Sequence, residues 1–185
     1  KTEKFNYDLP EHLIAQYPSL KRTDSKLLIA IESIQHQCFK DIANYLNKGD
    51  LLILNKTSVI PARLFGEKIT GGKIELLLER FLSNHQTLTQ IRSSRTPKDG
   101  AELVFSFQGQ RFLATVEGRQ DNFFILNWSD DPKPLFEQYG QIPLPPYMNR
   151  AVEKLDEERY ETIYADPNQK ASVAAPTAGM HFDQE

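Results

Sequence analysis

The chain has 185 residues and a formal net charge of −3, with 39% hydrophobic and 25% charged residues. This composition excludes a disordered chain and a protein coated in positive charge, although it does not exclude a local basic patch. No apolar run reaches the roughly 20 residues of a membrane span, and residues 1–8 lack the apolar core of a signal peptide. The single cysteine, Cys38, permits no internal disulfide. We therefore expect a cytoplasmic protein.

The first third of the chain predicts mixed α and β structure. The continuous apolar run at residues 51–54 is typical of a strand that is buried on both faces of a covered sheet. The other elements expected here are a short helix at residues 9–18, a strand at 26–31 with a hairpin partner at 36–39, and a helix at 41–46 that ends before Gly49.

The middle of the chain changes character and predicts only strands. Short alternating segments are separated by turn residues such as Gly71-Gly72 and Asp99-Gly100. About six short strands at this spacing predict a small closed barrel. The predicted strands are residues 62–70, 73–80, 86–92, 102–107, 111–117 and 123–127.

The last part of the chain returns to mixed structure, with a short helix at residues 134–139, an extended proline-rich strap at 142–147, a helix at 152–159 and a strand at 160–165. The sequence therefore predicts a multi-domain α and β protein, in which an α/β domain carries an inserted β-barrel. We assign residues 1–60 and 143–185 to the α/β domain and residues 61–142 to the barrel domain.

Residues 174–179 form a run of small side chains that ends in Gly179 and is followed by His181. Small side chains allow a ligand to approach the backbone closely, and a histidine after such a turn can transfer protons. The alternative is a tight turn that leads into a helix capped by Asp183.

Two further segments carry candidate binding residues. Residues 55–63 follow the predicted buried strand, and ligands of α/β sheets bind beyond the carboxyl ends of strands. The strap offers the aromatic ring of Tyr147 and the cation of Arg150, which suit a base and a phosphate. The alternatives are a polar linker for the first segment and a hinge for the second. No Cys/His cluster has zinc spacing, so we expect no metal.

Several of these stretches together resemble one family, the S-adenosylmethionine:tRNA ribosyltransferase-isomerases of queuosine biosynthesis. The matching stretches occur in the family's order and span nearly the whole chain. They are residues 5–10, 14–18, 49–55, 59–64, 70–75, 142–147, 159–165 and 172–182. The chain departs from the family pattern at Lys56, Ser58 and Ala171, and the resemblance implies that the family's chain continues past residue 185, so that the α/β domain is incomplete here.

The resemblance implies a transferase that moves the ribosyl part of S-adenosylmethionine onto preQ1 at the wobble position of tRNA and isomerises it. The products are epoxyqueuosine-tRNA, adenine and methionine, and S-adenosylmethionine is a co-substrate, so we expect no cofactor. We expect a monomer whose partners are S-adenosylmethionine and tRNA and which contacts no membrane. The alternatives are a non-catalytic RNA-binding barrel and, less well matched because no glycine-rich loop follows the first strand, a methyltransferase.

The resemblance also implies roles for individual residues. His181 is expected to transfer the proton, with Thr177 and the backbone of Ala178 and Gly179 holding the donor. Arg63 and Arg150 are expected to face a phosphate or the methionine carboxylate. The remaining substrate-binding candidates are Asn55, Thr57, Tyr147, Pro176 and Phe182.

Overall fold

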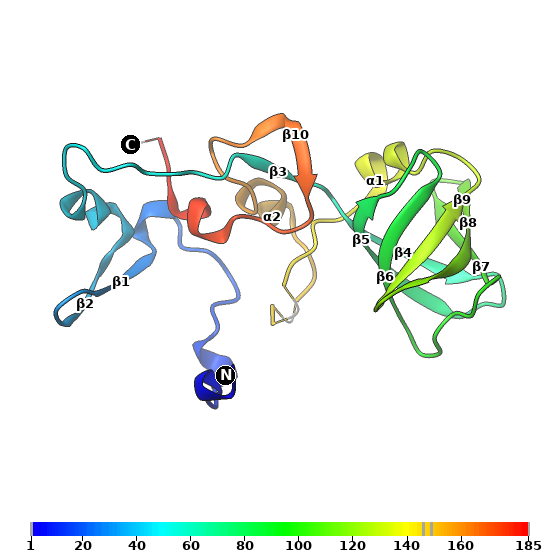
Figure 1. Cartoon of the computed structure of the whole chain (residues 1–185), viewed down its shortest axis with the longest axis horizontal. Coiled ribbons are helices and arrows are strands. Elements are labelled where there is room, and N and C mark those ends of the chain that lie inside the picture. The colour runs from blue at the N-terminus through cyan, green and yellow to red at the C-terminus, as the bar shows by residue number, and fades with distance from the viewer. Residues whose placement is uncertain (1, 146, 149, 185) are drawn as a thin grey trace.

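A computed structural model describes residues 2–145, 147–148 and 150–184, apart from the side chains at 170 and 171. The molecule is elongated, with a β-barrel at one end and the β1–β2 hairpin at the other (Figure 1). The segment that contains α2, β3 and β10 lies between them. None of the helices in the described residues is long and apolar enough to cross a membrane.

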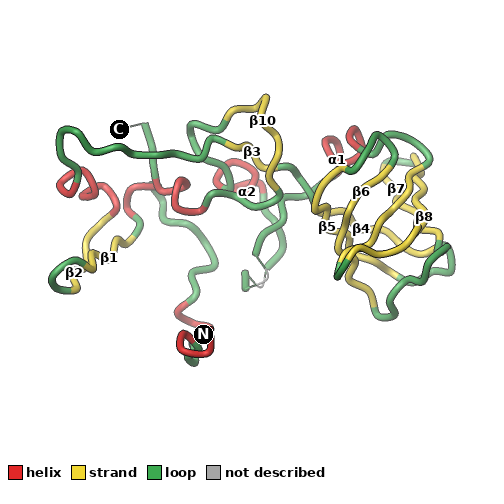
Figure 2. Tube along the Cα trace, in the orientation of Figure 1, coloured by secondary structure: helices red, strands yellow, loops and turns green. Residues whose placement is uncertain are grey.

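The barrel is closed and consists of six antiparallel strands in the order β4-β5-β6-β9-β8-β7. All six predicted strands are confirmed. They could be predicted because turn residues bound them in the sequence. Figure 2 shows these strands as yellow tubes grouped at one end of the molecule. Their bounds are β4 Arg63–Lys68, β5 Lys73–Phe81, β6 Gln86–Ser93, β7 Glu102–Phe107, β8 Gln110–Gln120 and β9 Phe123–Trp128.

Alternating side chains fill the barrel and form the main hydrophobic core. Leu64, Leu76 and Phe105 are almost completely buried, and each large apolar side chain buried in this way stabilises the fold by about 1.5–3 kcal/mol. Helix α1 (Lys133–Tyr139) covers one mouth of the barrel, with the Phe136 ring 6.1 Å from that of Trp128. The predicted barrel with a helix after it is thus confirmed, whereas the boundaries at residues 61 and 142 stay a prediction.

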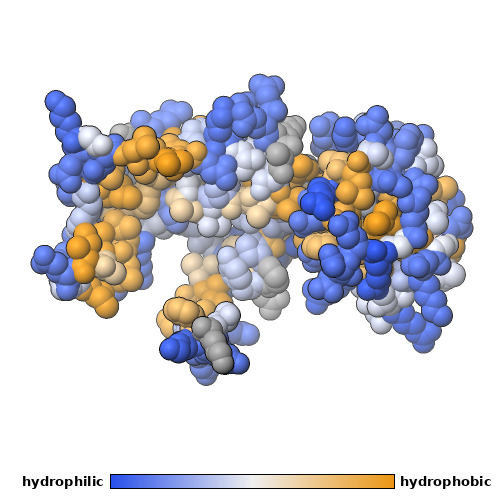
Figure 3. Space-filling view, in the orientation of Figure 1, coloured by the Kyte–Doolittle hydropathy of each residue, from blue (hydrophilic) through white to orange (hydrophobic). Residues whose placement is uncertain are grey.

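The rest of the chain contains two small sheets and short helices. The predicted hairpin is confirmed as β1 (Lys26–Ala30) and β2 (Ile34–Cys38), and hydrophobic side chains lie on the surface over it (Figure 3). The predicted helix at residues 152–159 is confirmed as α2 (Lys154–Arg159). β3 (Thr57–Val59) pairs in parallel with β10 (Asp166–Ser172). Five 3-10 helices complete the described elements: η1 Thr2–Phe5, η2 Glu11–Leu13, η3 Arg22–Asp24, η4 Phe39–Tyr45 and η5 Thr177–His181.

Two predicted strands are wrong. Residues 51–54 form no strand, and Leu51 and Ile53 are 84% and 83% exposed. An apolar run forms a buried strand only where neighbouring strands accept its hydrogen bonds, and none lies beside this run in the described residues. Residues 160–165 form a turn, and the strand β10 begins only at Asp166. The predicted helices at 9–18 and 41–46 are the 3-10 helices η2 and η4.

Candidate functional site

A groove of about 1050 Å³ lies between the outer face of the barrel and the proline-rich strap. One wall is the outer surface of β4, β5 and β6, where the alternation of the strands places polar and aromatic side chains. The other wall consists of the strap after Gln141, together with Tyr160, Val173 and Ala174, the first residue of the small-residue run. The barrel wall contributes Arg63, Phe65, Glu75, Leu77, Glu79, Gln90 and Arg92.

Arg63 connects the two walls of the groove. Its Nε atom lies 3.1 Å from Oε1 of Glu75, and its Nη2 atom donates to the carbonyl of Leu144 at 3.0 Å. Its backbone also exchanges hydrogen bonds with Gln141. A guanidinium that is held on both sides is pre-organised, and it presents its remaining donors in a fixed direction.

Arg150 lines the same groove, but its guanidinium is paired with a carboxylate. Its Nη1 and Nη2 atoms each lie 2.6 Å from an oxygen of Asp156, and the Tyr17 ring lies 4.5 Å from the guanidinium carbon. The hydrogen bond from Arg150 holds the pKa of Asp156 below its usual range. Arg150 therefore fastens the strap to α2, while Tyr147 stays 58% exposed beside it.

The small-residue run leaves the groove and ends in η5. Ala174 lines the groove, whereas Thr177 and Ala178 are exposed and Gly179 is buried. A Cβ atom on Gly179 would lie 2.2 Å from Oη of Tyr164, so only glycine allows this close approach. Pro176 immediately precedes η5, and its carbonyl accepts a hydrogen bond from the Gly179 N–H at 2.8 Å.

His181 lies at the end of η5, where it packs against Phe39, the first residue of η4. Its ring centroid is 5.4 Å from that of Phe39, and Phe182 meets the same Phe39 ring edge-on at 4.9 Å. Burial first, and the nearby Arg22 cation second, lower the pKa of His181 below its usual 6.5. The imidazole is therefore neutral at pH 7 and can accept a proton.

The hydrogen bonds of Ser25 determine which nitrogen of His181 is free. The Ser25 hydroxyl donates to the carbonyl of Arg22 at 2.9 Å, and its oxygen lies 2.9 Å from Nδ1 of His181. A carbonyl can only accept, so both hydrogen bonds form together when the hydroxyl donates to Arg22 and Nδ1 carries the proton that is donated to Ser25. The lone pair of the neutral ring is then on Nε2.

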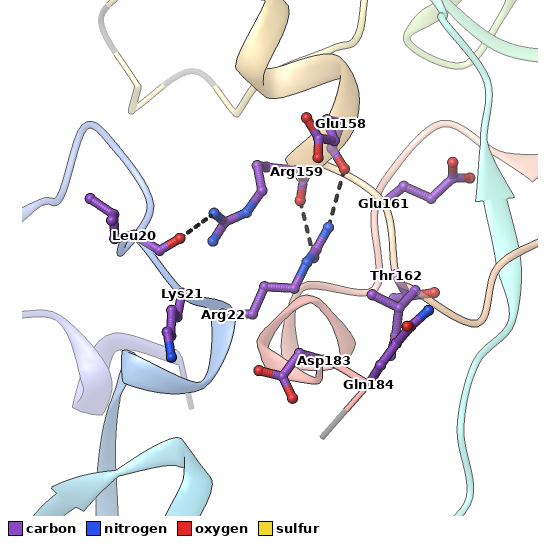
Figure 4. A pocket seen from close by; sticks show the side chains of 10 residues that line it. Leu20, Lys21, Arg22, Glu158, Arg159, Glu161, Thr162, Asp183 and Gln184 are labelled. Atoms are coloured by element: carbon purple, nitrogen blue, oxygen red, sulfur yellow. Dashed lines mark hydrogen bonds between the residues drawn. The ribbon is translucent and has the colours of Figure 1, made fainter.

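A second hollow, of about 590 Å³, is lined by residues from η3, the end of α2 and the segment after η5 (Figure 4). Arg22 and Arg159 project into it, but both donate to backbone carbonyls. Arg22 also donates to the carbonyl of Met180 at 2.9 Å, so it holds η5 against the end of α2. Burial lowers the pKa of Arg22, as expected for a cation that has a structural role.

Asn55 and Thr57 lie at the β3–β10 sheet and not in the groove. The side chain of Asn55 accepts a hydrogen bond from the Thr57 N–H at 3.0 Å, and the Thr57 hydroxyl donates to the carbonyl of Gln169. The structure thus brings Arg63 and Arg150 together in one groove and His181 and Phe182 together on Phe39. It does not bring these two groups of candidates into one pocket.

The comparisons with known proteins decide the family. A family model described as "Queuosine biosynthesis protein" matches residues 2–185. The chain belongs to the queuosine biosynthesis protein family. It is 47% identical over 184 residues to the S-adenosylmethionine:tRNA ribosyltransferase-isomerase of Acinetobacter baylyi, covering 98% of this chain and 53% of that protein.

Two further relatives of this chain have similar names. The ribosyltransferase-isomerase of Acinetobacter baumannii strain ATCC 17978 is 45% identical over 183 residues, covering 98% of this chain and 52% of that protein. The crystal structure of an S-adenosylmethionine tRNA ribosyltransferase from Thermotoga maritima is 34% identical, with a TM-score of 0.38, over 78% of this chain and 52% of that one. The chain spans about half the length of the relatives it matches.

Several residues of the groove were not among the candidates predicted from the sequence. Phe65, Glu79 and Arg92 lie on predicted strands. Alternate residues of a barrel strand face outward, and this alternation could have identified them as residues of the outer face. A buried contact was not predicted either, in which Ser58 donates to Oε1 of Glu161, an atom that the Val59 N–H also approaches at 3.3 Å. Ser58, a departure from the family pattern, thus helps to hold β3 against the segment after α2.

Proposed function

We propose that the full-length protein transfers and isomerises the ribosyl part of S-adenosylmethionine onto preQ1 at the wobble position of tRNA. The products are epoxyqueuosine-tRNA, adenine and methionine. The single observation that carries the proposal is the match of residues 2–185 to the queuosine biosynthesis family, together with the name of the 47% identical relative. S-adenosylmethionine is a co-substrate in this scheme, and no metal or other cofactor takes part.

The groove between the barrel and the strap is the proposed donor site. Its volume of about 1050 Å³ is at the upper end of the range of small-molecule pockets. The Phe65 ring is 48% exposed and offers a face on which adenine can stack. Glu79 offers a carboxylate to the sulfonium or ammonium group, and Arg63 offers a cation to the methionine carboxylate.

The reaction needs a base to remove the acidic proton beside the sulfonium, and an acid for the departing adenine. His181 is the proposed base, because its lowered pKa leaves it neutral and its Nε2 atom carries the lone pair. Since His181 lies at the far end of η5 from Ala174, the donor is proposed to extend along the small-residue run. Thr177 then offers its exposed hydroxyl, and the exposed backbone at Ala178 approaches the donor closely.

The remaining candidates hold these parts in place. Arg150 fixes the strap through Asp156, and Tyr147 on the strap is 58% exposed and offers a ring that can stack on a base. Phe182 packs η5 against Phe39, while Asn55 and Thr57 support the sheet from which the run departs. We further propose that the protein acts as a monomer in the cytoplasm.

The fate of isotopic label tests the proposal. Full-length protein is incubated with tRNA that carries preQ1 and with S-adenosylmethionine labelled either in the ribose or in the methyl group. The expected result is ribose label on the tRNA, methyl label in free methionine, and one adenine released for each ribosyl group transferred. Methyl label on the tRNA would indicate a methyltransferase, and tRNA binding without adenine release would indicate a non-catalytic RNA-binding protein.

A further inference from the structure

We infer that a strip of four cations on the barrel, Lys73, Arg92, Arg95 and Lys98, binds the RNA backbone and guides the target nucleotide into the groove. We call it the basic strip. The inference rests on the proposed function for the identity of the RNA. It adds the surface that the RNA contacts, which neither the family match nor the names of the relatives specify.

The charge of the chain is unevenly distributed. Residues 63–128, which form the barrel, contain nine Lys and Arg and seven Asp and Glu, a net charge of +2. The remainder of the chain therefore carries −5, since the whole carries −3. A polyanion that approaches this molecule is repelled by the larger part and attracted by the barrel.

The cations are also unevenly distributed within the barrel. The β4–β5 turn and the loop between β6 and β7 lie at the same end of the barrel, because β4 pairs with both β5 and β7. Arg95 and Lys98 lie in that loop, and Lys73 begins β5. The opposite end, with the β5–β6 and β7–β8 turns and the start of α1, carries Arg80, Arg111 and Lys133 beside more numerous carboxylates.

The strip leads directly into the groove. Arg92 pairs with Glu75 across β5 and β6, and because Ile74 points into the core, Glu75, Arg92 and Lys73 share the outer face. Lys73 and Arg92 are diagonal neighbours, about 7 Å apart between their Cα atoms. Arg92 also lines the groove. A backbone held by Arg95 and Lys98 at the barrel end therefore continues past Lys73 and Arg92 to the proposed donor site.

The loop that carries Arg95 and Lys98 is pre-organised. The carbonyl of Arg95 accepts hydrogen bonds from Lys68 Nζ and from the Ser93 hydroxyl. Pro97 is buried, and the Gly100 N–H donates to the carbonyl of Val116 at 2.8 Å. The backbone of the loop is fixed while the side chains of Arg95 and Lys98 are exposed, which lowers the entropic cost of binding a phosphate.

The charges of the strip are available to a partner. All four cations are exposed, and none of them forms an ion pair with another described residue. The carboxylates at this end of the barrel are Glu67, which is opposite Lys73 in the β4–β5 ladder, Asp99 in the loop, Glu102 at the start of β7 and Asp121 in the β8–β9 turn. Glu75 is already paired with Arg63. An RNA backbone fits a linear run of cations beside an aromatic-lined groove better than an acidic protein patch does.

The salt dependence of tRNA binding tests the strip. An unmodified tRNA transcript is titrated with full-length protein at about 50 to about 200 mM salt, a range over which phosphate contacts change affinity strongly. The strip variant carries Lys73→Gln, Arg92→Gln, Arg95→Gln and Lys98→Gln. The control carries Lys48→Gln, Arg80→Gln, Arg111→Gln and Lys133→Gln, which removes the same charge from exposed positions elsewhere. Both variants are first compared with wild type by circular dichroism and thermal unfolding.

The strip variant is expected to lose about 3 from the slope of log K against log salt, and at least about tenfold in affinity at low salt. The single variants Arg95→Gln and Lys98→Gln each lose about 0.7 to 0.9 from the slope. The control binds within about twofold of wild type. Unchanged slopes in the strip and single variants, or an equal loss in the control, would overturn the inference.

Adenine release separates this inference from the proposed function. If wild-type protein binds tRNA through the strip but releases no adenine with preQ1-tRNA, the proposed function fails and the strip stands. If wild-type protein releases adenine while the strip variant keeps its tRNA affinity and salt slope, the strip fails and the proposed function stands.

Discussion

The substitution Gly179→Ala probes how tightly the small-residue run packs. The new Cβ atom would lie 2.2 Å from Oη of Tyr164 and 2.9 Å from Cγ2 of Thr162. Overpacking of this kind costs about 1–3 kcal/mol. Alanine also restricts the unfolded chain relative to glycine, which offsets about 0.4–1 kcal/mol. We expect a net loss of about 1–2 kcal/mol in the free energy of unfolding, since the steric cost is the larger of these two effects.

The matched variant Tyr164→Phe identifies the cause of that loss. It removes Oη, the atom nearest to the new methyl group, and leaves Thr162 Cγ2 at 2.9 Å and Cζ of the ring at 3.3 Å. In urea titrations of the two single variants and the double variant, we expect the double variant to regain part of the loss. The coupling energy should be at least about 0.5 kcal/mol. A loss in Gly179→Ala that Tyr164→Phe leaves unchanged would refute the packing argument.

Further predictions concern individual residues. Ser25→Ala should slow adenine release by about tenfold, less than the ~10²–10⁴-fold that general-base catalysis contributes, because the imidazole itself remains. It should also move the acid limb of the pH–rate profile to lower pH, and Ser25→Thr should restore both. Because the pKa of His181 is lowered on folding, the free energy of unfolding should fall as pH drops below about 6.5, and His181→Gln should reduce that slope in urea titrations. Asp156→Asn should cost about 1–3 kcal/mol, because Asp156 is buried and the substitution weakens its charged hydrogen bonds to the half-buried Arg150. In the wild type the contribution of Asp156 should be lost only as pH falls through its lowered pKa, below about 3.9, in acid denaturation. Ile53→Asp in the 185-residue chain should change stability by less than about 0.5 kcal/mol, since the side chain is 83% exposed.

The barrel could be predicted from the sequence because its signals are local. Each strand shows its own alternation, and each turn its own Gly, Asp or Asn. The Gly71-Gly72 turn after β4 and the Asp121-Asn122 turn before β9 are examples. The run at residues 51–54 misled the prediction because its burial depends on strands elsewhere, and apolar composition alone does not supply them.

The candidate site could be predicted only in part, because its contacts join distant residues. The nitrogen at which His181 holds its proton depends on Ser25, 156 residues earlier in the chain. The pairing of Arg150 with Asp156 is close in sequence, yet nothing in the residue types distinguishes it from a free phosphate-binding cation. The residues that line the barrel side of the groove could be identified only once the outer faces of β4, β5 and β6 were known.

Photoaffinity labelling tests most directly whether the donor lies in the groove between the barrel and the strap. Full-length protein is irradiated with 8-azido-S-adenosylmethionine, with and without excess unlabelled S-adenosylmethionine, and the modified peptides are mapped. We predict competable label on β4 to β6, at residues such as Phe65 and Arg92, and at Val173 and Ala174. Competable label confined to the hollow of Arg22 and Arg159, or to the β1–β2 hairpin, would contradict the assignment.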